Sequence, residues 1–135
     1  MVPVLQLGDF LLASIQTQIT DEAALTFQSD ILRKVNVSHA QGIVIDITAL
    51  DVVDSYMARI LNETADMATL LGANVVLTGM QPGVALTLVE MGRELIGVDT
   101  AMSLEQGVEK LREKVADKHE QPAAQGDDGR EIGLD

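Results

Sequence analysis

Cysteine is absent from this 135-residue chain, and histidine occurs only as His39 and His119. A disulfide framework is therefore excluded, and so is a metal site built from Cys and His ligands. Catalysis by a nucleophile that a histidine activates also lacks candidates, because His39 falls in a predicted loop and His119 in the carboxyl-terminal segment. We expect a protein that is not an enzyme and that binds neither a metal nor another cofactor.

Aromatic and basic side chains are also scarce. Phe10, Phe27 and Tyr56 are the only aromatic residues, too few for a platform on which bases stack. Nine Lys and Arg residues stand against 21 Asp and Glu residues, and the resulting net charge of −12 repels nucleic acid phosphates and anionic lipid surfaces. We therefore expect no nucleic acid and no membrane partner, whereas an acidic surface suits solubility or a basic protein partner.

Apolar runs are short. The longest, such as Phe10–Ile15 and Gly42–Ile47, fall far below the ~20 residues of a membrane-spanning helix. The amino terminus, Met1-Val2-Pro3-Val4, has no basic segment followed by a long apolar stretch, so we expect no export signal and a cytoplasmic location. What the chain does contain is 47% hydrophobic residues, enough for the core of one domain.

Apolar periodicity predicts five strands and four helices. Gly8-Asp9 favours a tight turn between the first two strands, which should form an antiparallel hairpin. Thr20 and Ser103 are expected to cap helices, and Pro82 suits the first position of another. Strands are predicted at residues 2–7, 10–19, 42–47, 74–78 and 96–102, and helices after Thr20, at residues 55–71, after Pro82 and from Ser103.

Each predicted helix carries an apolar stripe, and Gly72 and Gly92 mark expected helix ends. The order β-β-α-β-α-β-α-β-α indicates an α/β sandwich whose mixed, mostly parallel sheet of about five strands is covered by helices. We expect one domain over residues 1–117 and an acidic, disordered segment over residues 118–135. The residues predicted to face the core are Ala24, Phe27, Ile31, Val35, Met57, Ile60, Ala65, Ala68, Leu71, Val84, Leu88, Met91, Leu95, Leu104, Val108, Leu111 and Val115.

Three carboxylates, Asp46, Asp51 and Asp54, lie between the predicted central strand and the next helix. Loops at the carboxyl ends of parallel strands commonly bind ligands, so Asp46 or Asp51 could belong to the Mg²⁺ site of a phospho-aspartate receiver. That site also needs a further acidic group at another strand end and a lysine after a later strand. Leu7-Gly8-Asp9 provides no acidic pair and Val98–Met102 no lysine, so solvated carboxylates at a helix front are the favoured interpretation.

Ser55 follows Asp54 at the predicted start of a helix, and either residue could be the N-cap. Capping alone would explain the serine. A kinase could also modify it, because the hydroxyl is expected at an exposed helix entrance. A phosphate would add about −1.5 to −2 charges beside free backbone N–H groups that can solvate it. Asp51 and Asp54 would make the modified surface still more negative, so we expect a changed binding face on an unchanged fold.

Three longer runs resemble STAS domains, and shorter ones extend the likeness over residues 2–115. Within that family the chain is similar to the single-domain scaffold proteins of the bacterial stressosome. The long runs are Gly42-Ile43-Val44-Ile45-Asp46-Ile47-Thr48, Val52-Val53-Asp54-Ser55-Tyr56-Met57-Ala58 and Leu71-Gly72-Ala73-Asn74-Val75-Val76-Leu77-Thr78-Gly79-Met80-Gln81-Pro82. The short ones are Leu11-Leu12-Ala13-Ser14-Ile15-Gln16, Ala24-Leu25-Thr26-Phe27-Gln28 and Leu104-Glu105-Gln106-Gly107.

The resemblance implies a scaffold and antagonist that packs with STAS-containing sensor paralogues, and with further copies of itself, in a large assembly. It implies a serine/threonine switch kinase as partner, released when Ser55 is phosphorylated, and Thr87 as a possible second phosphoacceptor. Two other interpretations stay open, a phospho-aspartate receiver and a purely structural shell subunit whose Ser55 is only a cap. The expected partner-binding face comprises Asp51, Asp54, Tyr56, Gln81 and Pro82.

Overall fold

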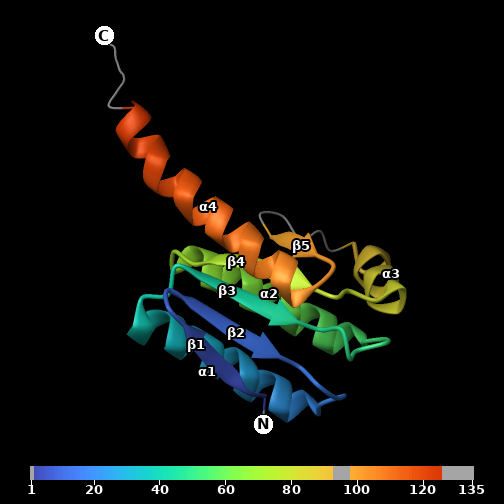
Figure 1. Cartoon of the computed structure of the whole chain (residues 1–135). Coiled ribbons are helices and arrows are strands. Elements are labelled where there is room, and N and C mark those ends of the chain that lie inside the picture. The colour runs from blue at the N-terminus through green and yellow to red at the C-terminus, as the bar shows by residue number, and fades with distance from the viewer. Residues whose placement is uncertain (1, 93–97, 126–135) are drawn as a thin grey trace.

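A computed structural model describes residues 2–92 and 98–125, and these form one five-stranded sheet with four helices (Figure 1). The α/β architecture and the order of elements predicted from the sequence are confirmed. In chain order the elements are β1 (Val4–Leu7), β2 (Phe10–Ser14), α1 (Asp21–Ser38), β3 (Gly42–Asp46), α2 (Ser55–Leu70), β4 (Asn74–Thr78), α3 (Pro82–Glu90), β5 (Asp99–Ala101) and α4 (Leu104–Gln125).

The strands lie side by side in the order in which the chain visits them, from β1 to β5. β1 and β2 form the antiparallel hairpin, and every other neighbouring pair is parallel. Helices α1 and α2 cover one face of the sheet, whereas α4 crosses the other face over β3, β4 and β5 (Figure 1). The carboxyl ends of β2, β3 and β4 therefore meet at one edge, where the loop leading to α2 begins.

Two hydrophobic clusters separate along the two faces of the sheet. Ile43 and Ile45 of β3 belong to the larger cluster, beneath α1, α2 and α3, because alternate residues of a strand point to the same side. Val44 of the same strand belongs to the smaller cluster, with Leu111 of α4. Burial on both faces explains why β3 and β4 are almost wholly apolar.

Local capping signals are confirmed. The Thr20 hydroxyl accepts a hydrogen bond from the Ala23 N–H at 3.0 Å, and the Ser103 hydroxyl accepts one from the Gln106 N–H at 3.2 Å. The Gln106 carboxamide oxygen accepts from the N–H of Met102, one residue earlier than a capping box expects. The predicted stripe of α1, Ala24, Phe27, Ile31 and Val35, is buried throughout.

The predicted end of β2 and the predicted burial of Leu71 and Leu104 are wrong, and Leu104, the first residue of α4, is exposed. β2 ends at Ser14 rather than at residue 19, because its parallel partner β3 ends at Asp46, which is paired with Ser14. One further bond, from the Ile15 N–H to the Asp46 carbonyl at 3.0 Å, closes that ladder. Leu71, predicted to face the core, is exposed because it follows the last residue of α2, where Gly72 turns the chain with a φ of 97°.

Helix α4 extends beyond the sheet to Gln125, so the loss of structure predicted from Lys118 is not seen for residues 118–125 (Figure 1). The predicted core residue Leu95, the start of the predicted strand 96–102 and residues 126–135 lie outside the described residues. Within residues 2–92 and 98–125, no helix is both long enough and apolar enough to cross a membrane.

Candidate functional site

Ser55 occupies the first helical position of α2, and its side chain is exposed. The N-cap is Asp54, whose Oδ1 accepts the Met57 N–H at 2.8 Å, while its carbonyl accepts the Ala58 N–H at 3.0 Å. The two candidate caps are thus resolved in favour of Asp54. Within the described ranges the Ser55 hydroxyl makes no side-chain hydrogen bond, and it is open to solvent.

The loop that presents Ser55 is anchored by apolar side chains. Ile47, Leu50 and Val53 are buried, and the Leu50 N–H donates to the Ile47 carbonyl at 3.0 Å. Between these anchors the polar residues Asp51 and Asp54 stay exposed. Because the anchors recur along the loop, the polar side chains between them are held at the surface in one arrangement.

Residues distant in sequence fasten the same loop from both sides. The Gln18 side-chain amide donates to the Val52 carbonyl at 3.0 Å, and the Gln81 side-chain amide donates to the Thr48 carbonyl at 3.0 Å. Gly83, in the first turn of α3, lies directly against the loop before α2. A Cβ on Gly83 would be 2.4 Å from the Asp51 carbonyl oxygen. The start of α3 and the loop before α2 therefore form one continuous surface.

The predicted partner-binding residues meet on this surface. Asp51, Asp54 and Pro82 are exposed, whereas Tyr56 and Gln81 are half-buried. The Arg59 guanidinium carbon lies 5.2 Å from the centre of the Tyr56 ring, over its face, which is the geometry of a cation–π contact. Arg59 also forms the predicted surface pair with Glu63, at 4.0 Å. Sequence reasoning did not identify the links from Gln18 and Gln81, because they join residues more than 30 positions apart.

Thr87 has a structural role in holding α3 to the loop. Its hydroxyl lies 3.2 Å from the Val53 carbonyl and 3.1 Å from the Gly83 carbonyl, and it can donate to either. Thr87 is only partly exposed. Phosphorylation at this position, which remains a prediction, would require the hydroxyl to leave both carbonyls.

We expect Thr87→Val to lower the free energy of unfolding by about 1 to 2 kcal/mol, because the Val53 carbonyl loses its link to α3 in a partly buried place. Thr87→Ser keeps the hydroxyl and is the matched control, which should recover most of the loss. Urea denaturation followed by circular dichroism measures both. If Thr87→Val and Thr87→Ser lower the free energy of unfolding equally, the hydroxyl does not hold the loop to α3.

The N-cap gives a second prediction. Asp54→Ala removes the acceptor of the Met57 N–H and should cost about 0.5 to 2 kcal/mol, whereas Asp54→Asn retains an acceptor and should cost much less. Thermal unfolding of the two variants beside the parent protein measures the difference. Equal losses would show that the carboxylate charge, and not the cap, is what stabilises α2.

The Asp46 carboxylate accepts hydrogen bonds from two side chains of the same fold. Its Oδ1 accepts from the Thr48 hydroxyl at 2.9 Å and from the Thr78 hydroxyl at 2.8 Å, and so ties the end of β3 to the end of β4. In the part of the chain that the structure describes, no three or more His, Cys, Asp or Glu side chains gather closely enough to hold a metal ion. The carboxylate arrangement that a receiver-type Mg²⁺ site needs is not assembled by these residues.

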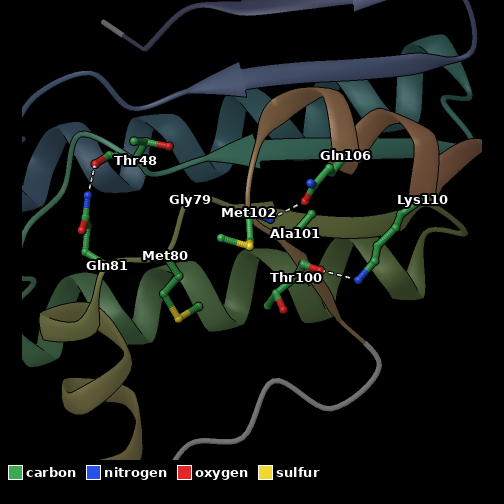
Figure 2. A pocket seen from close by; sticks show the side chains of 9 residues that line it. All are labelled: Thr48, Gly79, Met80, Gln81, Thr100, Ala101, Met102, Gln106 and Lys110. Carbon is green, nitrogen blue, oxygen red and sulfur yellow. Dashed lines mark hydrogen bonds between the residues drawn. The ribbon is translucent and has the colours of Figure 1, made fainter.

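A hollow of about 480 Å³ lies beside the same loop, where β4 and β5 end and α4 begins (Figure 2). Gly79 lets the turn after β4 approach Thr48 closely in this hollow, because a Cβ on Gly79 would lie 1.8 Å from the Thr48 hydroxyl oxygen. Sequence reasoning did not foresee the hollow, since its walls come from elements whose neighbours could not be read along the chain. Its lining residues are Thr48, Gly79, Met80, Gln81, Thr100, Ala101, Met102, Gln106 and Lys110.

Comparison with known proteins places these features in context. The sequence model of the STAS domain matches residues 2–116. A serine-to-glutamate variant of RsbS from Moorella thermoacetica is 39% identical, with a TM-score of 0.78 over 85% of this chain and 97% of that one. A chain in a solved structure of the stressosome is 38% identical, with a TM-score of 0.71 over 84% of this chain and 98% of that one. That structure describes the stressosome as a signal integration and transduction hub.

A longer curated protein is also similar. RsbT co-antagonist protein RsbRA of Bacillus subtilis (strain 168) is 32% identical over 95 residues, which make up 70% of this chain. The same match covers 35% of RsbRA, so this chain spans about a third of that relative. The likeness to RsbS and to the stressosome chain, in contrast, extends over nearly the whole length of those chains.

Proposed function

Because this chain belongs to the STAS domain family, we propose that it is a non-catalytic, phosphoregulated scaffold and antagonist of a stressosome in bacterial stress signalling. In this proposal it sequesters a serine/threonine switch kinase in the cytoplasm and releases that kinase when Ser55 is phosphorylated. Its other partners are STAS-containing sensor paralogues and further copies of itself. The likeness to RsbS, to a stressosome chain and to the co-antagonist RsbRA supports this assignment.

The observation that carries the proposal is the exposed hydroxyl of Ser55 at the front of α2. Asp54 already caps the helix, so modification of Ser55 does not remove the cap. The first N–H groups of a helix lack intrahelical partners, and they can solvate a phosphate at this position. The fold should therefore survive a change of about −1.5 to −2 charges.

The surroundings of Ser55 explain how the added charge would act on a partner. Asp51 and Asp54 already make this surface acidic, while Val52 is an exposed apolar side chain between them. A partner that buries Val52 must bring its own surface close to Ser55. A phosphate there would have to be desolvated or matched by new cations, and docking should weaken in consequence.

The chemistry of the phosphoryl group tests this proposal against the receiver interpretation. Incubation with the switch kinase and ATP should yield acid-stable phosphoserine. An acid-labile group that hydroxylamine removes would instead show an acyl phosphate on Asp46 or Asp51 and would overturn the proposal. A protein that stays unmodified both with the kinase and in stressed cells, as judged by intact mass, would favour a purely structural shell subunit.

A further inference from the structure

The hollow beside the loop before α2 lies where α/β sheets commonly bind small molecules. β4 ends at Thr78 and its parallel neighbour β5 at Ala101, and the hollow opens just beyond these two strand ends (Figure 2). Loops beyond the carboxyl ends of parallel strands are frequent ligand sites. The volume of about 480 Å³ is also in the range of small-molecule pockets. The proposed function leaves this hollow without a role.

Hydrogen bonds hold the walls of the hollow in place. The Gly79 N–H donates to the Ala101 carbonyl at 3.0 Å, which joins the turn after β4 to the end of β5. The Met102 N–H donates to the side-chain oxygen of Gln106 at 3.2 Å, which joins the end of β5 to the first turn of α4. Because these walls are already fixed, a ligand that enters has little protein to order.

The lining of the hollow contains a cation and no carboxylate. None of the nine described residues that line it is Asp or Glu, although the whole chain has 21 such residues. Lys110 supplies the positive charge, and its ammonium group donates to the Thr100 carbonyl. An ammonium group has three donors, so two remain for a ligand. The charge of the hollow therefore favours an anion.

Lys110 also differs from most basic residues of the protein, because it has no acidic partner among the described side chains. Asp99, which precedes Thr100, instead pairs with Lys114 at 2.9 Å. In a chain that carries −12, an anion is repelled least beside a cation that no carboxylate neutralises. The basic side chains that lie within 4.0 Å of a carboxylate are Arg33, Arg59, Arg112 and Lys114.

Further donors and an apolar wall lie beside Lys110. Gln106 precedes it by four positions on α4, so both side chains lie on one face of the helix and reach toward the hollow (Figure 2). The Gln106 oxygen already accepts the Met102 N–H, which leaves its amide N–H groups for a ligand. Met80 and Met102 add flexible apolar side chains, and Met102 is 85% exposed. The lining thus suits a charged head joined to an apolar body.

We propose that this hollow binds a small organic anion, with its charged head on Lys110 and Gln106 and its apolar body against Met80 and Met102. A carboxylate and a phosphate monoester share this chemistry. The head takes the two free donors of the ammonium group, so the bond from Lys110 to Thr100 is kept. A charge-assisted hydrogen bond fixes the head, and the methionine side chains adapt to the shape of the body.

This site adjoins the loop before α2 and does not include Ser55. Thr48 lines the hollow and belongs to that loop, and its carbonyl accepts the Gln81 side-chain amide at 3.0 Å. A ligand in the hollow therefore contacts two residues that hold the loop in place. The inference adds a ligand to the proposed scaffold, and its test needs neither a kinase nor a phosphate on Ser55.

Titration of the isotope-labelled full chain with sodium hexanoate, followed by NMR at constant ionic strength, tests this site. Hexanoate joins a carboxylate to a short apolar chain. The amide signals of residues 79–81 and 100–106 should shift and saturate with a dissociation constant on the order of 1 mM, as expected for so small a ligand. Hexan-1-ol has the same chain without the charge and should bind about tenfold more weakly.

Variants of two lysines separate the charge at this site from charge elsewhere. Lys110→Met keeps an apolar stem and should raise the dissociation constant of hexanoate about tenfold, whereas Lys110→Arg keeps the charge and should retain most of the affinity. Lys34→Met is the matched control, because Lys34 lines a different hollow, and it should leave the constant unchanged. No saturable shift at residues 79–81 and 100–106, or equal effects of the two methionine variants, would overturn the proposal.

Three further probes define the ligand. Hexyl phosphate replaces the carboxylate by a phosphate monoester, and whichever of it and hexanoate binds more tightly identifies the preferred head. Acetate and inorganic phosphate lack the apolar body and should bind about tenfold more weakly than hexanoate. If they bind as tightly, the hollow takes a simple anion only and the proposal is wrong. Failure of this test would leave the role of Ser55 intact, and an unmodified Ser55 would leave this site intact.

Discussion

Ser55→Ala is expected to retain the switch kinase permanently. In the parent protein, ATP should allow the bound kinase to phosphorylate Ser55 and then dissociate, whereas alanine offers no hydroxyl to modify. A pull-down of kinase on immobilised protein, before and after ATP is added, measures the difference. The kinase should remain on Ser55→Ala after ATP at the level seen without ATP, while most of it leaves the parent protein.

Two control variants separate charge from mere substitution at this position. Ser29→Ala changes an exposed serine of α1 and should release kinase as the parent protein does. Ser55→Asp should bind kinase less tightly even without ATP, although incompletely, because one carboxylate carries less charge than a phosphate. Equal release from the parent protein and from Ser55→Ala after ATP would contradict the assignment of Ser55.

Gly79→Ala is expected to produce the largest loss of stability among the variants considered. Gly79 has a φ of 75°, and a Cβ would lie 1.8 Å from the Thr48 hydroxyl oxygen and 3.0 Å from the Thr48 Cα. The left-handed backbone and the forced shift of the loop together should cost about 2 to 4 kcal/mol. Chemical denaturation of parent and variant measures this loss.

Gly8→Ala is the matched control for that experiment. Gly8 also has a left-handed backbone, with a φ of 62°, but a Cβ there would meet nothing within 4 Å. Gly8→Ala should therefore lower the free energy of unfolding only by the cost of the left-handed backbone, about 1 to 2 kcal/mol. The excess at Gly79 therefore reports the contact between the turn after β4 and the loop that leads to Ser55. Equal losses in the two variants would show that this contact does not constrain the loop.

Features that depend on neighbours in sequence could be predicted well. The apolar run of β3 predicted a central strand, and the apolar stripe of α1 predicted its buried face. The helix entrance at Ser55 was predictable too, because the capping side chain of Asp54 and the Met57 N–H that donates to it lie within four residues of each other. The choice between Asp54 and Ser55 as the cap needed the structure, since both side chains can accept the hydrogen bond.

Features that depend on which strands are neighbours could not be predicted. The carboxyl end of β2 is set by the end of β3, and the hollow that contains Lys110 arises because β5 and α4 meet beside the end of β4. The bonds from Gln81 to Thr48 and from Thr87 to Val53 span 33 and 34 positions, with no local signal at either end. These bonds make the surface around Ser55 a property of the folded chain and not of one motif.

Rigid presentation of Ser55 follows from these distant bonds. Loop residues before α2 are anchored by buried side chains and held by α3, so the Ser55 hydroxyl lies in a defined place, where the proposed kinase would meet it. A rigid site also means that phosphorylation has little structure to rearrange. Its effect on partners should then come from charge at the surface.

Phosphosite mapping by mass spectrometry, on folded protein incubated with the switch kinase and ATP, tests this central claim most directly. The account predicts a single added phosphate, located on Ser55. A protein that gains no phosphate, or gains it at other residues while Ser55 stays unmodified, would contradict the account.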